Sequence, residues 1–201
     1  VNGHVLIPRQ DTENLVEEIM RDLHDGMRIL DMCTGSGCIL ISLLHYSNDC
    51  TGVGVDLSEE ALKVARENAR RLLEIDAAET LVNAGAQMPI LSGEGEKDCK
   101  FVQSNLFENV EGMFDLIVSN PPYIRPDVIE PLMPEVRDYE PRMALDGRSD
   151  GLYFYREIIV HAREHLARGG QLFFEIGYDQ AQAVVDLFQM QGYKEITVKK
   201  D

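Results

Sequence analysis

A short apolar segment that leads into a glycine turn and then into a helix constrains this chain more than any other feature. Residues 27–32 have the length and apolar character of a buried strand, and two glycines follow within residues 33–37. An apolar helical segment then continues to about residue 44. Parallel strands need a crossover connection, usually a helix, whereas antiparallel strands can be joined by a tight turn. This unit therefore predicts an α/β domain built on a parallel sheet.

The same alternation of strand and helix continues along the chain. Further strands are expected at residues 51–56, 101–104, 114–119, 171–176 and 193–198. Helices are expected at residues 12–25, 58–73, 152–166 and 180–190. With 201 residues, the chain has a length that suits one domain. We therefore predict a mostly parallel, Rossmann-like α/β sheet with helices on both faces.

Two segments interrupt this alternation. Residues 76–98 are expected to extend a helix or form a separate one, and to end in a polar loop. Residues 121–141 contain six prolines, and proline is expected to keep a segment out of helix and sheet. The second segment is therefore predicted to be a rigid loop.

The glycine turn carries features of a cofactor site. Gly35 and Gly37 let the backbone turn sharply and approach a ligand closely. Asp56 ends the next predicted strand, where its carboxylate can accept hydrogen bonds from ribose hydroxyls. Leu40 replaces the third glycine of a dinucleotide fingerprint, and no Gly-Lys-Ser/Thr follows as in a P-loop. A ligand with a ribose is therefore predicted at this turn, which departs from both of those patterns, and the alternative is a tight turn with an incidental aspartate.

A second candidate site is the sequence Asn-Pro-Pro-Tyr at residues 120–123, directly after a predicted strand. The Asn120 side-chain oxygen and the Pro121 carbonyl are hydrogen-bond acceptors that suit an NH2 group, and Tyr123 offers a flat stacking surface. The motif marks methyltransferases that act on DNA amino groups, RNA guanines or protein glutamine amides, and alone it does not choose among them. A proline-stiffened turn is the alternative. Ligands bind at the carboxyl ends of strands in such sheets, so this motif and the glycine turn are expected to meet.

Composition narrows the partners. The chain carries 35 acidic residues against 19 Lys and Arg, a net charge of -16, which weighs against nucleic acid because phosphate binding relies on clustered basic residues. No apolar run approaches the roughly 20 residues of a membrane span. The four cysteines form no CxxC pair, and no histidine stands at zinc-finger spacing from them. We therefore expect a protein partner, no membrane, no metal site and free thiols in the cytoplasm, while the oligomeric state stays open.

Together these motifs resemble the HemK-type protein-glutamine N5-methyltransferases, which modify peptide chain release factors. The similar segments run almost from end to end and comprise residues 6–9, 12–13, 31–38, 55–58, 114–124, 140–142 with 144–145, 150–152 and 175–177. Asp31 and the loop after it resemble the first motif of class I S-adenosylmethionine methyltransferases. The resemblance implies the fold of that class, S-adenosylmethionine as cofactor with S-adenosylhomocysteine as product, and methylation of a glutamine amide in a release factor.

The resemblance also implies roles for individual residues. Those that would bind the cofactor are Asp31, Cys33, Thr34, Gly35, Ser36, Gly37, Asp56, Asn105, Leu106 and Asn120. Those that would bind the substrate amide are Asn120, Pro121, Pro122 and Tyr123, and of these Asn120, Pro121 and Tyr123 would serve catalysis. Arg9 and Glu13 belong to a family motif near the pocket, and we assign them no chemical step, since a structural ion pair is an equal alternative. No histidine lies in a motif, so no general base is evident.

The resemblance further implies that residues 1–201 are the catalytic domain. The family's small helical substrate-recognition domain ahead of it, and its last antiparallel strand, are expected to be absent. Three other functions stay open at this point. They are methylation of a ribosomal-protein glutamine, methylation of adenine-N6 or guanine-N2 amino groups in DNA or rRNA, and cofactor binding without catalysis.

Overall fold

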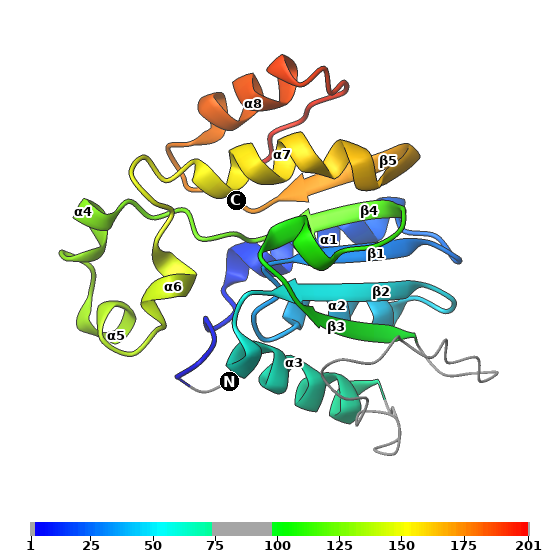
Figure 1. Cartoon of the computed structure of the whole chain (residues 1–201), viewed down its shortest axis with the longest axis horizontal. Coiled ribbons are helices and arrows are strands. Elements are labelled where there is room, and N and C mark those ends of the chain that lie inside the picture. Colours follow the sequence, from blue (N-terminus) through cyan, green and yellow to red (C-terminus); the bar gives the residue numbers. More distant parts are fainter. Residues whose placement is uncertain (1–2, 74–97, 201) are drawn as a thin grey trace.

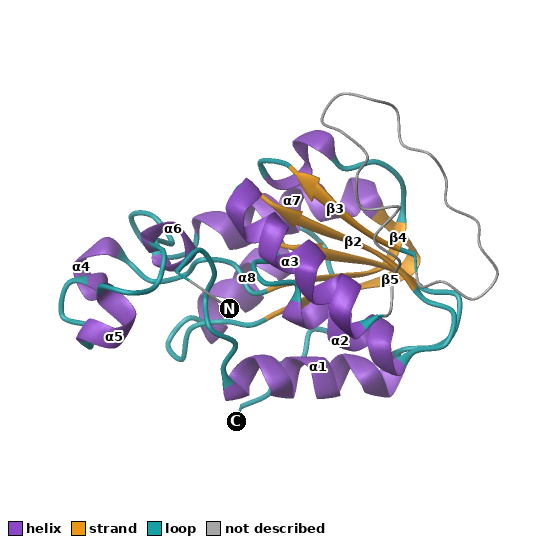
Figure 2. Cartoon of the chain, turned by 90° about the horizontal axis from the view of Figure 1, so that it is seen from below, coloured by secondary structure: helices purple, strands orange, loops and turns teal. Residues whose placement is uncertain are grey.

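The computed structural model describes residues 3–73 and 98–200, and it shows one parallel sheet between two layers of helices (Figure 1, Figure 2). Within these ranges, five strands are hydrogen-bonded in the order β3-β2-β1-β4-β5, and every neighbouring pair is parallel. The strands are β1 (Arg28–Met32), β2 (Thr51–Asp56), β3 (Cys99–Gln103), β4 (Phe114–Ser119) and β5 (Leu166–Phe174). The predicted Rossmann-like sheet is confirmed.

The long helices cover the two faces of this sheet. One face carries α1 (Gln10–Asp22), α2 (Cys38–Tyr46) and α3 (Glu59–Leu72), and the other carries α7 (Tyr153–His165) and α8 (Ala181–Met190). A single 3-10 turn, η1 (Leu106–Asn109), follows β3 and contacts α7. All five helices were expected from apolar periodicity, with boundaries that differ by a few residues.

Two hydrophobic cores form because neighbouring residues of a strand point to opposite faces. Ile29 and Leu116 pack in the core beneath α1 and α2, whereas Leu30 and Ile117 pack in the core beneath α7. All four side chains are fully buried. The strands therefore read as continuous apolar runs, as expected of a parallel sheet covered on both faces.

The chain order reverses between β1 and β4, and this reversal positions the site. From β1 the chain moves outward through β2 to β3, and it then returns to β4 on the opposite side of β1. The connections after these two strands leave in different directions, which opens a crevice at the carboxyl ends of the strands. The two candidate motifs both follow these strands.

The proline-rich segment is helical in part, so the prediction that proline would keep it out of helix is wrong. Two short helices, α4 (Pro126–Ile129) and α5 (Pro134–Arg137), lie within it, and a third, α6 (Arg142–Leu145), follows directly. Pro126 and Pro134 stand at the start of their helices, where no intrahelical N–H is required and the fixed φ of proline suits the first turn. Figure 1 shows these helices at one end of the molecule, beyond the carboxyl ends of the strands.

The strand predicted at residues 193–198 is not formed, and the prediction is wrong. The backbone turns at Gly192, with φ of +75°, and the Tyr193 ring packs on Phe188 of α8 at 5.1 Å between centroids. The Tyr193 hydroxyl donates to the Ile159 carbonyl of α7 at 2.9 Å. The aromatic side chain that suggested a strand is thus held by the helix layer.

Strand β5 begins earlier than predicted, at Leu166, directly after α7. A register shift accommodates Gly169 and Gly170, because Phe114 pairs with Leu166 while Leu116 pairs with Gln171. Both glycines lie within the irregular start of the strand. The predictions for residues 76–97 lie outside the described residues. In the described ranges, no helix combines the length and apolar character that crossing a membrane requires.

Candidate functional site

A cavity of about 600 Å³ lies at the carboxyl ends of the strands. The loops after β1, β2, β3 and β4 contribute to its wall, together with residues 4–8 and the segment around α6. Nine of the predicted site residues line it, namely Cys33, Thr34, Gly35, Ser36, Asp56, Asn105, Leu106, Asn120 and Pro122. The structure therefore brings the glycine turn and the Asn-Pro-Pro-Tyr motif to one space, as the strand order requires.

Four predicted site residues lie outside this lining: Asp31, Gly37, Pro121 and Tyr123. Asp31 and Pro121 are buried, and Gly37 caps the start of α2. Tyr123 is half-buried and packs on the apolar cluster formed by Tyr155, Ile159 and Val184. Burial raises the pKa of the Tyr123 hydroxyl to about 12. Each of the four is adjacent in sequence to a residue of the lining.

The turn between β1 and α2 is held by its own backbone. The Thr34 N–H donates to the Val55 carbonyl of β2 at 2.9 Å, and the Gly37 N–H donates to the Thr34 carbonyl at 2.8 Å. Gly37 has φ of +78°, and a Cβ on it would lie 2.8 Å from Ile41 Cδ1. The positive φ favours glycine there, and an added Cβ would also make the Ile41 side chain move. The turn thus exposes the backbone of residues 33–36 to the cavity.

Asp31 is fully buried beneath this turn. Its Oδ2 accepts hydrogen bonds from Thr34 Oγ1 at 2.6 Å and from the Leu40 N–H at 3.3 Å. Its Oδ1 has no hydrogen-bond partner among the described residues. Burial raises the pKa of the Asp31 carboxyl to about 7, although the Thr34 hydrogen bond opposes the shift. An unpaired buried carboxylate oxygen is a place where a cationic group of a ligand is stabilised.

Asp56 lies on the cavity wall at the end of β2. Its Oδ2 accepts from the Gly35 N–H at 2.9 Å, and its Oδ1 accepts from the Ser58 N–H at 2.8 Å. Burial raises the pKa of this carboxyl, and the two backbone hydrogen bonds oppose the rise. Each carboxylate oxygen has a second lone pair, so Asp56 can also accept from ligand hydroxyls.

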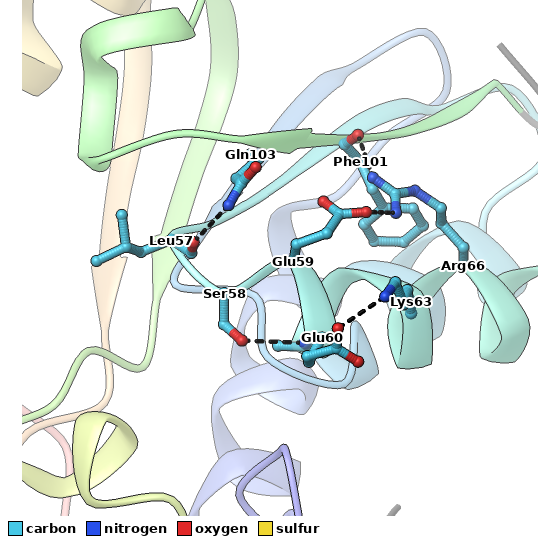
Figure 3. Close-up of polar contacts among 9 residues, drawn as sticks. Leu57, Ser58, Glu59, Glu60, Lys63, Arg66, Phe101 and Gln103 are labelled. Atoms are coloured by element: carbon cyan, nitrogen blue, oxygen red, sulfur yellow. Dashed lines mark hydrogen bonds and ion pairs between the residues drawn. The ribbon is translucent and has the colours of Figure 1, made fainter. Parts of the chain in front are cut away.

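The loop that carries Asp56 is fixed to the start of α3 and to β3 (Figure 3). Ser58 Oγ accepts from the Ala61 N–H at 3.2 Å, which makes Ser58 the N-cap of α3. Gln103 Nε2 of β3 donates to the Leu57 carbonyl at 3.1 Å. Figure 3 also shows Arg66 between Glu59 and the Phe101 carbonyl. These contacts hold the Asp56 carboxylate in place before any ligand arrives.

The Asn-Pro-Pro-Tyr turn is clamped from outside by the returning chain. Gln180 Nε2 donates to the Tyr123 carbonyl at 3.0 Å, and the Gly147 N–H donates to the Ile124 carbonyl at 2.8 Å. A Cβ on Gly147 would lie 2.7 Å from the Tyr123 backbone, and one on Gly151 would lie 2.5 Å from the Tyr123 carbonyl oxygen. Glycine at both positions therefore permits the close approach that fixes the turn.

Arg9 pairs with Glu140, with Nη2 and Oε2 at 3.0 Å. The Glu140 side chain is buried, and it follows the α5 segment, so the pair joins the N-terminal segment to the short helices. Glu13 instead accepts a hydrogen bond from Gln10 at 2.8 Å. The structural ion pair that sequence offered as an alternative thus exists for Arg9, with a partner that sequence did not indicate.

Thr12 and Glu175 are buried polar residues to which sequence assigned no role. Thr12 Oγ1 donates to Glu175 Oε2 at 2.6 Å and accepts from Asn120 Nδ2 at 3.4 Å. Thr12 lines the cavity. Both residues stand in segments of the quoted resemblance, but their separation of 163 positions hid the contact. The sequence did contain one signal for Thr12, because it is a polar residue on the apolar face of the helix predicted at residues 12–25.

Comparisons with known proteins agree with this geometry. A family described as a methyltransferase domain matches residues 23–145. Proteins named release factor glutamine methyltransferase from Caulobacter vibrioides and Geobacter sulfurreducens are each 41% identical, over 203 and 202 residues. The alignments cover 100% of this chain, which spans 63% of the length of each relative.

Solved structures share the fold at low identity. A ribosomal protein L11 methylase from Lactobacillus delbrueckii subsp. bulgaricus superposes with a TM-score of 0.61 at 19% identity, covering 96% of this chain and 75% of that one. A methyltransferase from Pyrococcus furiosus superposes with a TM-score of 0.62 at 17% identity, covering 94% and 76%. At this identity the likeness concerns the fold of class I methyltransferases alone.

Proposed function

The chain belongs to a methyltransferase domain family, and from this premise we propose that it methylates a protein glutamine. The proposed reaction transfers the methyl group of S-adenosylmethionine to the side-chain N5 of a glutamine in a peptide chain release factor. The relatives that match the whole chain carry that name. The observation that carries the proposal is that Asn120 and the Asp56 side of the wall face one cavity. Methyl donor and amide acceptor then share a single space.

The cofactor is proposed to lie along the wall formed by residues 33–36, Asp56 and Leu106. Asp56 accepts from the ribose hydroxyls, and Leu106 packs against the adenine beside Asn105. The unpaired Oδ1 of Asp31, beneath the same turn, favours a cationic amino-acid end of the cofactor. A cavity of about 600 Å³ is within the usual range for a ligand of this size. When bound, S-adenosylmethionine supplies a methyl group activated by a sulfonium.

The chain's own residues then hold the amide. Asn120 Oδ1 and the Pro121 carbonyl accept from the two hydrogens of the glutamine NH2, and Pro122 and Tyr123 keep the turn rigid. The amide nitrogen is a weak nucleophile because its lone pair is delocalised, so the main task is alignment. The same acceptors stabilise positive charge that develops on nitrogen. No residue is proposed as general base. The proton that the amide nitrogen loses after methyl transfer goes to water.

We place this reaction in the cytoplasm, with a protein as partner. The four cysteines, Cys33, Cys38, Cys50 and Cys99, are unpaired thiols, as a reducing compartment maintains them. The acidic charge favours a substrate protein with basic surroundings over nucleic acid.

Replacing Asn120 by alanine tests the proposal. The Asn120→Ala variant should lower the rate of methyl transfer to release factor by about a hundredfold or more, because it removes a transition-state acceptor. S-adenosylmethionine binding, measured by calorimetry, should weaken far less. A transfer rate near that of the unaltered chain would contradict the role of Asn120.

A further inference from the structure

Three side chains from distant parts of the sequence form one hydrogen-bonded line beside the cavity. Asn120 follows β4, Thr12 stands in the first turn of α1, and Glu175 follows β5. Asn120 Nδ2 lies 3.4 Å from Thr12 Oγ1, which lies 2.6 Å from Glu175 Oε2. Thr12 is 5% exposed and Glu175 is 9% exposed. Water therefore has little access to the two partners behind Asn120.

The direction of these hydrogen bonds follows from counting protons. A threonine hydroxyl has one proton and two lone pairs, and a carboxylate can only accept. The Thr12 proton goes to Glu175, so Thr12 can offer only a lone pair to its other neighbour. Asn120 must therefore turn its NH2 group toward Thr12. The opposite amide orientation would place two oxygens against each other without a proton between them.

We propose that Thr12 and Glu175 are positioning residues that fix the orientation of the Asn120 amide, so that its Oδ1 serves as acceptor for the substrate NH2. This rests on the proposed function, in which Asn120 receives an amide. A flipped Asn120 would present its own NH2 to the substrate NH2, and two donors cannot pair. The line of hydrogen bonds thus selects the productive one of two amide orientations that have nearly the same shape.

Glu175 acts on Asn120 both through Thr12 and directly, because burial raises the pKa of its carboxyl while hydrogen bonds from Thr12 and from Asn120 oppose that rise. Glu175 is absent from the cavity lining, whereas Thr12 and Asn120 are part of it. Its backbone is fixed from both sides, because its N–H donates to the Ser119 carbonyl at 3.1 Å and its carbonyl accepts from the Tyr155 hydroxyl at 3.1 Å. The Glu175 backbone is thus held beside the end of β4, and its carboxylate accepts from Thr12 Oγ1.

The first test compares two substitutions of Thr12. Thr12→Val removes the hydroxyl at nearly the same volume, and Thr12→Ser keeps it. Thr12→Val should lower kcat by about ten- to hundredfold while KM for S-adenosylmethionine stays within about twofold, because only the orientation of the acceptor is lost. Thr12→Ser should restore most of the rate. Thermal unfolding of both variants reports whether the fold is kept.

A double-mutant cycle separates this role from a structural one. If Thr12 acts through Asn120, then Thr12→Val should change kcat by less than about twofold in the Asn120→Ala background. The same loss in both backgrounds, or a Thr12→Val rate equal to that of the unaltered chain, would overturn the proposal. Glu175→Gln, which keeps an acceptor oxygen, should retain more activity than Glu175→Leu, and the reverse order would also overturn it.

A measurement without substrate distinguishes failure of this inference from failure of the proposed function. The side-chain NH2 of Asn120 gives a pair of amide signals in a 15N-correlated NMR spectrum, identified by their loss in Asn120→Ala. Those signals should shift strongly in Thr12→Val and little in Thr12→Ser. If release factor is not methylated but this pattern appears, the proposed function fails and the positioning role stands. Unchanged Asn120 signals in Thr12→Val would overturn the positioning role whatever the substrate.

Discussion

At the scale of single residues, Asp31 connects the chemistry of the site to pH. Its buried carboxyl has a pKa raised to about 7 from an ordinary value of 3.8. Between these values the unfolded chain is ionised at this position and the folded chain is protonated. The contribution of Asp31 to stability is therefore fully present below about pH 4 and is lost as the pH rises through about 7.

Cofactor binding should show the opposite dependence on pH. A cationic group of S-adenosylmethionine near Oδ1 favours the ionised form, so affinity should rise as the pH increases toward about 7, by at most about tenfold per pH unit. Asp31→Asn cannot ionise and should flatten this rise. Calorimetric titrations at several pH values measure it. An identical pH profile in Asp31→Asn would exclude Asp31 as its source.

Sequence could place the residues that stand at strand ends. Gly35, Asp56 and Asn120 face the cavity because parallel strands bring their carboxyl ends together. The ends of these strands could be predicted because the strands are apolar runs in the sequence. Sequence could not reveal the Thr12–Glu175 contact, because it depends on how α1 packs beside the end of β5. That packing leaves no local pattern. Sequence could not predict the Arg9–Glu140 pair either, because the two residues are 131 positions apart and meet only in the folded chain.

At the scale of elements, the segment of short helices is held against the Asn-Pro-Pro-Tyr turn by close backbone contact. Adding a methyl group in Gly147→Ala places a Cβ 2.7 Å from the Tyr123 backbone, so the turn or the segment must move. We expect a loss of about 1–3 kcal/mol in the free energy of unfolding, as for other overpacked sites. Methyl transfer should fall as well. Denaturant unfolding and initial rates measure the two effects.

Gly3→Ala provides the matched control for this change, since nothing lies within 4 Å of a Cβ at that position. It should leave both unfolding and methyl transfer as they are. If Gly147→Ala behaves like Gly3→Ala in both assays, the close contact between Gly147 and the Tyr123 backbone contributes neither to stability nor to methyl transfer.

Two elements show why local patterns mislead. Proline was expected to exclude helix in residues 121–141, yet Pro126 and Pro134 begin helices of one turn each, where their missing N–H is harmless. The apolar residues at 193–198 suggested a strand, yet Tyr193 packs on the layer of α7 and α8. In the first case the place of proline in the helix decided the structure, and in the second the contact of Tyr193 with the helix layer decided it.

At the scale of the whole molecule, the net charge of -16 affects stability. Repulsion among 35 acidic residues, only partly offset by 19 basic ones, opposes the folded state. The ion pairs on the described surface are mostly exposed, and such pairs contribute little. Raising the salt concentration from about 0.01 M to about 0.15 M shortens the screening length and should therefore raise Tm. A Tm that falls with salt would mean that ion pairs outweigh the repulsion.

We propose that one cavity brings a methyl donor to a glutamine amide of a release factor. The measurement that tests it most directly incubates the chain with labelled S-adenosylmethionine and, in separate reactions, a peptide chain release factor, ribosomal proteins, DNA and rRNA. Mass spectrometry then locates the methyl group, and a release factor with the modified glutamine replaced by asparagine is the control. We predict one N5-methylglutamine in the release factor and no label in the other substrates or the control. Label on a ribosomal protein or on a nucleic-acid amino group, with none on the release factor, would contradict the account.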